Sequence, residues 1–85
     1  MKIYRNKRTA NTTIRMIKND EGKPVALFGT VEDLLLARLI TDSAYDAWHW
    51  LIILVDTLDD DGYGDGEAFD TREELIAWAK EHFAA

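Results

Sequence analysis

The residues with the clearest capacity for chemistry form one acidic, glycine-rich stretch, residues 59–67. It reads Asp-Asp-Asp-Gly-Tyr-Gly-Asp-Gly-Glu, so five carboxylates lie within nine residues. Closely spaced carboxylates repel one another and attract hard cations such as Ca²⁺, and glycine allows the tight turns that aim them at one ion. The stretch therefore predicts either a calcium loop or an acidic contact surface.

The spacing of this stretch does not match an EF-hand loop. Placing Gly62 or Gly66 at the sixth position leaves no glutamate at the twelfth position, where a bidentate ligand is needed. Asp59, Asp61 and Asp65 resemble the shorter calcium loops of repeat proteins, but this chain has a single copy. We therefore favour an acidic contact patch, keep calcium binding as the alternative, and expect no bound metal.

The other chemically active residue types offer little support for catalysis. Asp46 and His49 lie one helical turn apart, a spacing used by metal sites, but His82 is the one other imidazole. Ser43 is the single serine, and a helix N-cap explains it. Without cysteine the chain has no thiolate nucleophile, disulfide or cysteine-based zinc site. We expect a protein that is not an enzyme and needs no cofactor.

Charge is divided unevenly along the chain, which has 16 acidic and 10 basic residues and a net charge of −6. Residues 1–24 hold seven bases and two acids, a net charge of +5, whereas residues 25–85 hold three bases and 14 acids, a net charge of −11. Such a negative field suits a basic, nucleic-acid-binding surface of another protein and repels DNA and RNA. We therefore do not expect direct nucleic-acid binding, although Arg5, Lys7, Arg8 and Arg15 could contact phosphates. The alternative is that the two parts attract each other within the fold or are simply solvated.

The first 29 residues carry the signals of β-structure. Apolar and polar residues alternate in part along residues 12–18, and a second short apolar run occupies residues 24–29. Between them, residues 19–22 have the composition of a tight turn, with a glycine suited to positive φ. This pattern predicts an antiparallel hairpin of residues 12–18 with 24–29.

From Thr30 onward the apolar residues recur at helical spacing. Thr30 and Thr71 each precede acidic residues in a capping-box pattern, which predicts helices starting after them. Residues 44–58 are ambiguous because their tryptophan, isoleucine and valine residues favour a strand. Their polar residues fall at helical offsets and residues 51–55 do not alternate, so we predict a buried helix there and keep a strand as the alternative.

Together these elements predict one α+β domain over residues 1–85. Its small antiparallel sheet, an N-terminal hairpin or meander, would pack against two or three α-helices. No apolar run approaches the roughly 20 residues of a membrane span, so we expect a soluble, cytoplasmic protein. A chain this short gains little stability from its core, which leaves a homodimer open.

The end of the chain resembles a segment found in many small bacterial and phage proteins. Residues 69–78, which read Phe-Asp-Thr-Arg-Glu-Glu-Leu-Ile-Ala-Trp, are similar to a turn leading into a helix, as in the small anti-CRISPR proteins of phages. The resemblance implies a class of short, non-catalytic proteins that work by occupying a surface. It carries over no functional residue.

We therefore expect an acidic interaction module, an inhibitor of the phage or mobile-element type that acts like a DNA mimic on a larger protein. A further alternative is an antitoxin-like neutraliser, which would bind by the same charge complementarity and differ only in its partner. The residues expected to bind the partner are Asp42, Asp46, Asp59, Asp60, Asp61, Tyr63, Asp65 and Glu67.

Overall fold

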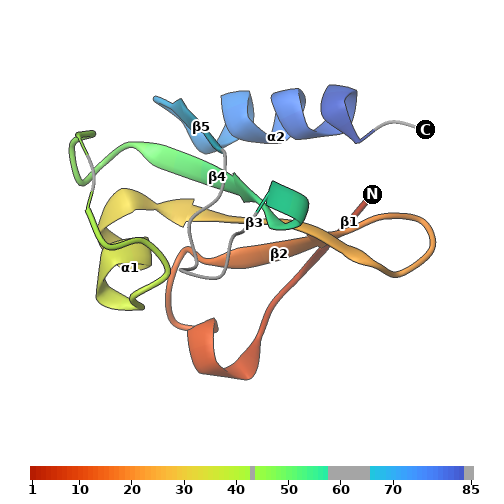
Figure 1. Cartoon of the computed structure of the whole chain (residues 1–85), viewed down its shortest axis with the longest axis horizontal. Coiled ribbons are helices and arrows are strands. Elements are labelled where there is room, and N and C mark those ends of the chain that lie inside the picture. The colour runs from red at the N-terminus through yellow and green to blue at the C-terminus, as the bar shows by residue number, and fades with distance from the viewer. Residues whose placement is uncertain (43, 58–65, 84–85) are drawn as a thin grey trace.

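The computed structural model describes residues 1–42, 44–57 and 66–83 of the chain (Figure 1). In this part the strands are β1 Lys2–Tyr4, β2 Arg15–Lys18, β3 Pro24–Thr30, β4 Trp50–Leu54 and β5 Gly66–Phe69. The α-helices are α1 Val31–Leu36 and α2 Arg72–His82, and the 3-10 helices are η1 Lys7–Thr9 and η2 Val55–Thr57. No helix in the described ranges is long and apolar enough to cross a bilayer.

The five strands form one sheet in which each strand pairs antiparallel with the next along the chain, in the order β1-β2-β3-β4-β5. The predicted hairpin is confirmed as β2 and β3. In its turn the Asn19 side chain accepts hydrogen bonds from the backbone N–H groups of Glu21 and Lys23, at 2.9 and 3.0 Å. Gly22 supplies the positive φ of 79°.

The predicted fold class is wrong in the balance of its elements. The structure is mostly sheet, and α2 is the one helix longer than two turns in the described part, where two or three covering helices were expected. The predicted helix over residues 44–58 is also wrong, because β4 lies at its centre, between β3 and β5. Ile52 faces one side of the sheet and Ile53 the other, and both are buried. A strand covered on both faces needs no alternation, so the strand propensity of these residues prevails.

The helix predicted after Thr30 does form, with the Thr30 side chain accepting a hydrogen bond from the Asp33 N–H, but it ends early. Arg38 adopts φ 60°, in the left-handed region. The N–H groups of Arg38 and Leu39 then donate to the carbonyls of Leu35 and Leu34, at 3.0 and 2.9 Å. These two bonds form a Schellman motif, which closes the helix after six residues.

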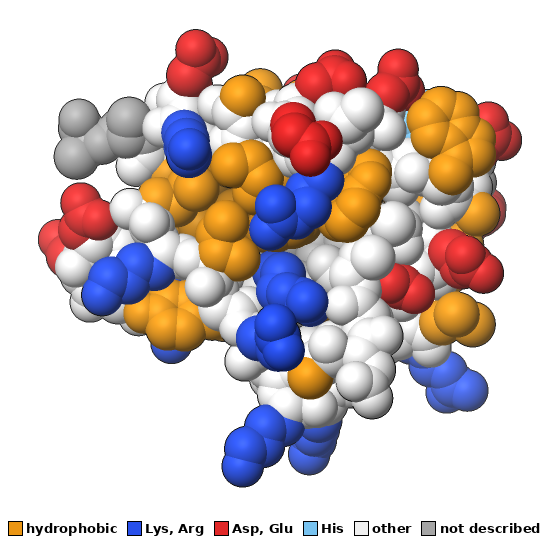
Figure 2. All heavy atoms as spheres, turned by 180° about the vertical axis from the view of Figure 1, so that it is seen from behind, with side chains coloured by type: hydrophobic (Ala, Val, Ile, Leu, Met, Phe, Trp, Pro, Cys, Tyr) orange, Lys and Arg blue, Asp and Glu red, His pale blue; other side chains and the backbone are white. Residues whose placement is uncertain are grey.

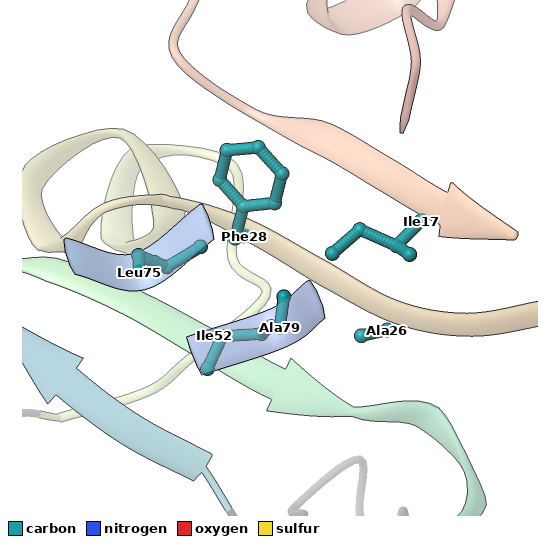
Figure 3. Close-up of a cluster of buried hydrophobic side chains, with 6 residues drawn as sticks. All are labelled: Ile17, Ala26, Phe28, Ile52, Leu75 and Ala79. Atoms are coloured by element: carbon teal, nitrogen blue, oxygen red, sulfur yellow. The ribbon is translucent and has the colours of Figure 1, made fainter. Parts of the chain in front are cut away.

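The larger part of the core lies between the sheet and α2. Figure 3 shows Leu75 and Ala79 of α2 next to side chains from β2, β3 and β4, and all of these side chains are fully buried. The helix predicted after Thr71 is confirmed: the Thr71 hydroxyl accepts a hydrogen bond from the Glu74 N–H at 3.2 Å. The helix therefore presents a continuous apolar face to the sheet.

The smaller part of the core lies on the opposite face, where Leu34 of α1 packs with Ile14 and Ile53. Asp33 ties this helix to the start of β2 by accepting hydrogen bonds from the Thr13 N–H and hydroxyl, both at 2.7 Å. The Thr13 backbone and side-chain bonds hold the pKa of Asp33 below its ordinary value, because they stabilise the charged form. The α1 side of the sheet thus depends on a short helix and a small cluster.

Candidate protein-interaction surface

Most of the large hydrophobic side chains exposed in the described part of the chain belong to one stretch of the sequence. Of the seven large hydrophobic residues exposed in the described part, five belong to residues 35–48: Leu35, Leu36, Leu39, Tyr45 and Trp48. We refer to these five residues, together with the carboxylates Glu32 and Asp46, as the α1–β4 surface. Apolar exposure concentrated in this way is typical of interaction sites.

The backbone brings the two ends of this surface together. The His49 carbonyl accepts a hydrogen bond from the Val31 N–H at 2.9 Å, and the Ala47 carbonyl accepts one from the Glu32 N–H at 3.3 Å. The segment before β4 is therefore bound to the first turn of α1. Leu35 and Leu36 follow Glu32 at the three- and four-residue spacing that places side chains on one helix face.

The aromatic residues of the surface are arranged around His49. The Trp48 ring stacks on the His49 ring at a centroid distance of 3.9 Å, and the Tyr45 ring lies 5.8 Å from it. His49 Nε2 in turn lies 3.3 Å from a carboxylate oxygen of Asp70. Trp48 is nevertheless 58 % exposed and Tyr45 51 % exposed. The Trp48 ring is thus supported on one side by His49 while much of it remains accessible to a partner.

The electrostatic setting of this surface is acidic. Figure 2 shows acidic side chains beside hydrophobic ones on the right of the molecule and along its top, and a column of lysine and arginine side chains from the centre to the lower edge. The ion pairs seen within the described ranges are the Met1 amino group with Asp20, at 2.9 Å, and His49 with Asp70. The first of these lowers the pKa of Asp20 through its hydrogen bond to the amino terminus. Neither ion pair involves a lysine or arginine side chain. These two pairs therefore do not neutralise the acidic residues of this surface with basic side chains of the N-terminal hairpin.

The structure brings together part of the set of residues expected to bind a partner. Asp42 and Asp46 both lie in the connection from α1 to β4. Glu67 pairs in register with Ile52, which places it on the α2 face of the sheet, away from the α1–β4 surface. The remaining expected residues, Asp59, Asp60, Asp61, Tyr63 and Asp65, lie outside the described residues, and so does the calcium alternative.

The leucines of the surface were expected in a helix that starts after Thr30, and Tyr45 and Trp48 in the buried helix over residues 44–58. One signal could have corrected this: Leu34, Leu35 and Leu36 are consecutive, and three successive residues cannot all face the same side of a helix. In the structure Leu34 is fully buried, whereas Leu36 is 76 % exposed. The short helix therefore divides its leucines between the core and the surface.

No family model matches the chain, and no curated protein and no solved structure matches it significantly. The function is therefore inferred from the geometry and chemistry of this surface.

A shallow pocket adjoins the surface at Leu39. It has a volume of about 170 Å³ and lies between η1, β2 and the segment after α1, lined by Asn6, Thr9, Ile14, Arg15, Met16, Leu27 and Leu39. Its walls are largely apolar, so it could take one aliphatic side chain of a partner.

A metal site is not formed by the described side chains. Within residues 1–42, 44–57 and 66–83, no group of three or more His, Asp or Glu residues is placed to hold a metal ion. His49 and Asp70 instead contribute to the support of Trp48 and Tyr45.

Proposed function

We propose that this chain is a non-enzymatic interaction module whose α1–β4 surface binds a basic surface of a larger protein in the cytoplasm. It would act as a small inhibitor of the phage or mobile-element type, occupying a surface that otherwise binds nucleic acid. The observation that supports this most strongly is the exposure of Trp48 and Tyr45 beside the carboxylate of Asp46.

The aromatic and leucine side chains would supply the binding energy. Interface energy is concentrated in a few central residues, among which tryptophan and tyrosine are enriched, and an apolar centre excludes water from the contacts around it. Trp48 is already stacked on His49, so little conformational freedom would be lost when it is covered. An arginine or lysine of the partner could also lie on the accessible face of its ring.

The carboxylates would supply specificity and speed of association. Asp46 and Glu32 border the apolar residues, and a rim of one charge sign steers an oppositely charged partner during encounter. The acidic residues at positions 59–61 and 65 would extend this negative field, as the sequence predicts. The net charge of −6 favours a basic partner over the polyphosphate backbone of a nucleic acid.

The experiment starts from affinity capture on the immobilised chain, using an extract of the cells that produce it. A protein retained at low salt is identified, purified and titrated with the chain in a calorimeter. We expect a basic partner, a Kd that weakens as salt is raised, and a loss of affinity of roughly tenfold or more for Trp48→Ala. The variant Asp59/Asp60/Asp61→Asn should bind more weakly and more slowly.

Two matched controls make the result specific. Ile3→Ala removes an exposed apolar side chain on β1, and Glu81→Gln removes an exposed carboxylate on α2, so both should leave the Kd unchanged. Equal affinities of Trp48→Ala and the wild-type chain, together with a Kd that does not respond to salt, would contradict the proposal. If the partner is a toxin, the module is an antitoxin-like neutraliser that uses the same surface.

A further inference from the structure

Two arginine side chains, from β2 and from the start of α2, lie on the α2 face of the sheet, and a third arginine follows β1. Arg15 pairs in register with Phe28, so both side chains point to that face. The guanidinium carbon of Arg72, the first residue of α2, lies 5.7 Å from the centroid of the Phe28 ring. The β1–β2 register ends at Tyr4 and Met16, and Arg5 is the next residue of the chain after this last pair. We call Arg5, Arg15 and Arg72 the arginine row.

This row is electrostatically unfavourable within the fold. A cation at a helix N-terminus opposes the helix dipole, and Arg72 occupies that position at the start of α2. Arg15 is held in place by hydrogen bonds from Nη1 to the carbonyls of Thr12 and Ile14, at 2.9 and 2.7 Å. Among the described residues, no ion pair joins the row to a carboxylate. Features that cost stability in this way are expected where a ligand is bound.

The row ends at a strand edge. β1 is the end strand of the described sheet, pairs with β2, and is exposed at all three of its residues. The outer edge of such a strand carries backbone groups that can pair with an added strand. A strand added there would place alternate side chains on the α2 face beside Ile3, which pairs with the buried Ile17, and Arg5 follows two residues further along the chain. Figure 2 shows a hydrophobic patch bordered by the column of lysine and arginine side chains.

The chemistry favours an acidic peptide segment over a nucleic acid. Phe28, the aromatic residue that Arg72 contacts, is fully buried and has no face on which a base could stack. The net charge of −6 and the glutamates of α2 oppose a dense polyphosphate. An extended segment with alternating acidic and apolar residues would meet both the arginines and the exposed Ile3 side chain.

We infer that the free edge of β1, together with the arginine row, binds an extended acidic segment of a partner protein by strand addition. Carboxylates of the added strand would pair with Arg5 and Arg15, and its apolar residues would cover Ile3. This site shares no residue with the α1–β4 surface, so either proposal can fail without the other.

The test titrates the intact chain with an eight-residue peptide of alternating glutamate and valine, followed by NMR at low salt. We expect shifts in the amide signals of β1 and weakening of roughly tenfold in Arg5→Gln, because a charge-assisted bond is lost. Lys23→Gln, at an exposed base in the β2–β3 turn, is the matched control and should bind like wild type. Arg5 is exposed, so its variant remains decisive if Arg15→Gln fails to fold.

Three further probes can overturn the inference. The same peptide with N-methyl groups at alternate residues cannot complete a strand pairing, so equal binding would exclude strand addition. Equal binding by a glutamine–valine peptide would exclude the arginine row as the recognition element. Tighter binding by oligothymidylate than by the acidic peptide, or no binding of the acidic peptide at millimolar concentration, would also overturn it.

Discussion

The two faces of the sheet are covered to very different extents. On one face, the eleven residues of α2 bury Leu75 and Ala79 against the sheet. On the other face, α1 ends after six residues and buries Val31 and Leu34, while Leu36 remains 76 % exposed. The α2 face leaves few large apolar side chains exposed, whereas leucine and aromatic side chains remain exposed on the α1 side.

This difference separates two roles for the same residue types. Apolar side chains on the α2 face hold the sheet together, because burying them removes their surface from water. On the α1 side, the exposed leucines keep their apolar surface in water in the free chain. They would contribute this hydrophobic free energy when a partner covers them. We therefore expect substitutions on the α2 face to lower the stability of the fold, and substitutions of exposed residues on the α1 side to weaken binding to a partner.

The largest effect is expected at the centre of the α2 face. Phe28→Ala removes a fully buried ring between β2 and β4 and should lower the free energy of unfolding by about 3–5 kcal/mol. A loss of that size approaches the whole stability of a small domain, so the variant should be largely unfolded. Circular dichroism and urea unfolding measure it; a loss below about 1 kcal/mol would mean that this face is not the main core.

Two neighbouring leucines of α1 provide the sharpest contrast within one element. Leu34→Ala should lower the free energy of unfolding by about 2–5 kcal/mol, because Leu34 is fully buried. Leu36→Ala should change it by less than about 0.5 kcal/mol, because the side chain is 76 % exposed. Urea unfolding of the two variants compares them directly, and similar losses would erase the distinction between core and surface in this helix.

The tie between α1 and β2 is expected to respond to pH. Asp33→Ala should lower the free energy of unfolding by about 1–3 kcal/mol at neutral pH, since the Thr13 N–H and hydroxyl lose a charged acceptor. The pKa of Asp33 is lowered on folding, so its contribution is present above the ordinary value of 3.8 and is lost as the pH falls below it. The difference between the wild-type chain and Asp33→Asn should therefore shrink in acid; a difference independent of pH would contradict this.

The smallest effect concerns the residue that ends α1. Arg38 has φ 60°, a conformation that costs a non-glycine residue about 1 kcal/mol. Arg38→Gly should therefore raise the free energy of unfolding by up to about 1 kcal/mol while keeping the exposed leucines in place. Thermal unfolding measures the gain; destabilisation would show that the arginine side chain makes a contribution larger than the backbone strain.

The sequence predicts local elements better than the arrangement of the chain. The β2–β3 hairpin and α2 follow from turn and capping residues, whose effects act over a few positions. The helix predicted over residues 44–58 fails because the assignment of β4 depends on strands on both sides, which local spacing does not reveal. The early end of α1 is equally hidden, since Arg38 lacks the usual glycine signal at that position.

The sequence predicts an acidic contact surface but not its geometry. Charge counting predicts an acidic chain that binds a basic partner, and Asp46, one of the residues expected to bind it, lies in the connection from α1 to β4. The exposure of Trp48 and Leu36 depends on where the helix stops and on how the following segment docks on its first turn. Those features arise from tertiary contacts, so aromatic and leucine residues that resemble core in the sequence become surface in the fold.

We propose that a basic partner binds the α1–β4 surface and not the α2 face. An NMR titration of the labelled chain with the purified partner tests this most directly. We expect the Trp48 indole signal and the methyl signals of Leu35, Leu36 and Leu39 to shift, while those of Leu75 and Ala79 stay in place. Shifts confined to α2, or a Trp48 signal that stays unchanged at saturation, would contradict it.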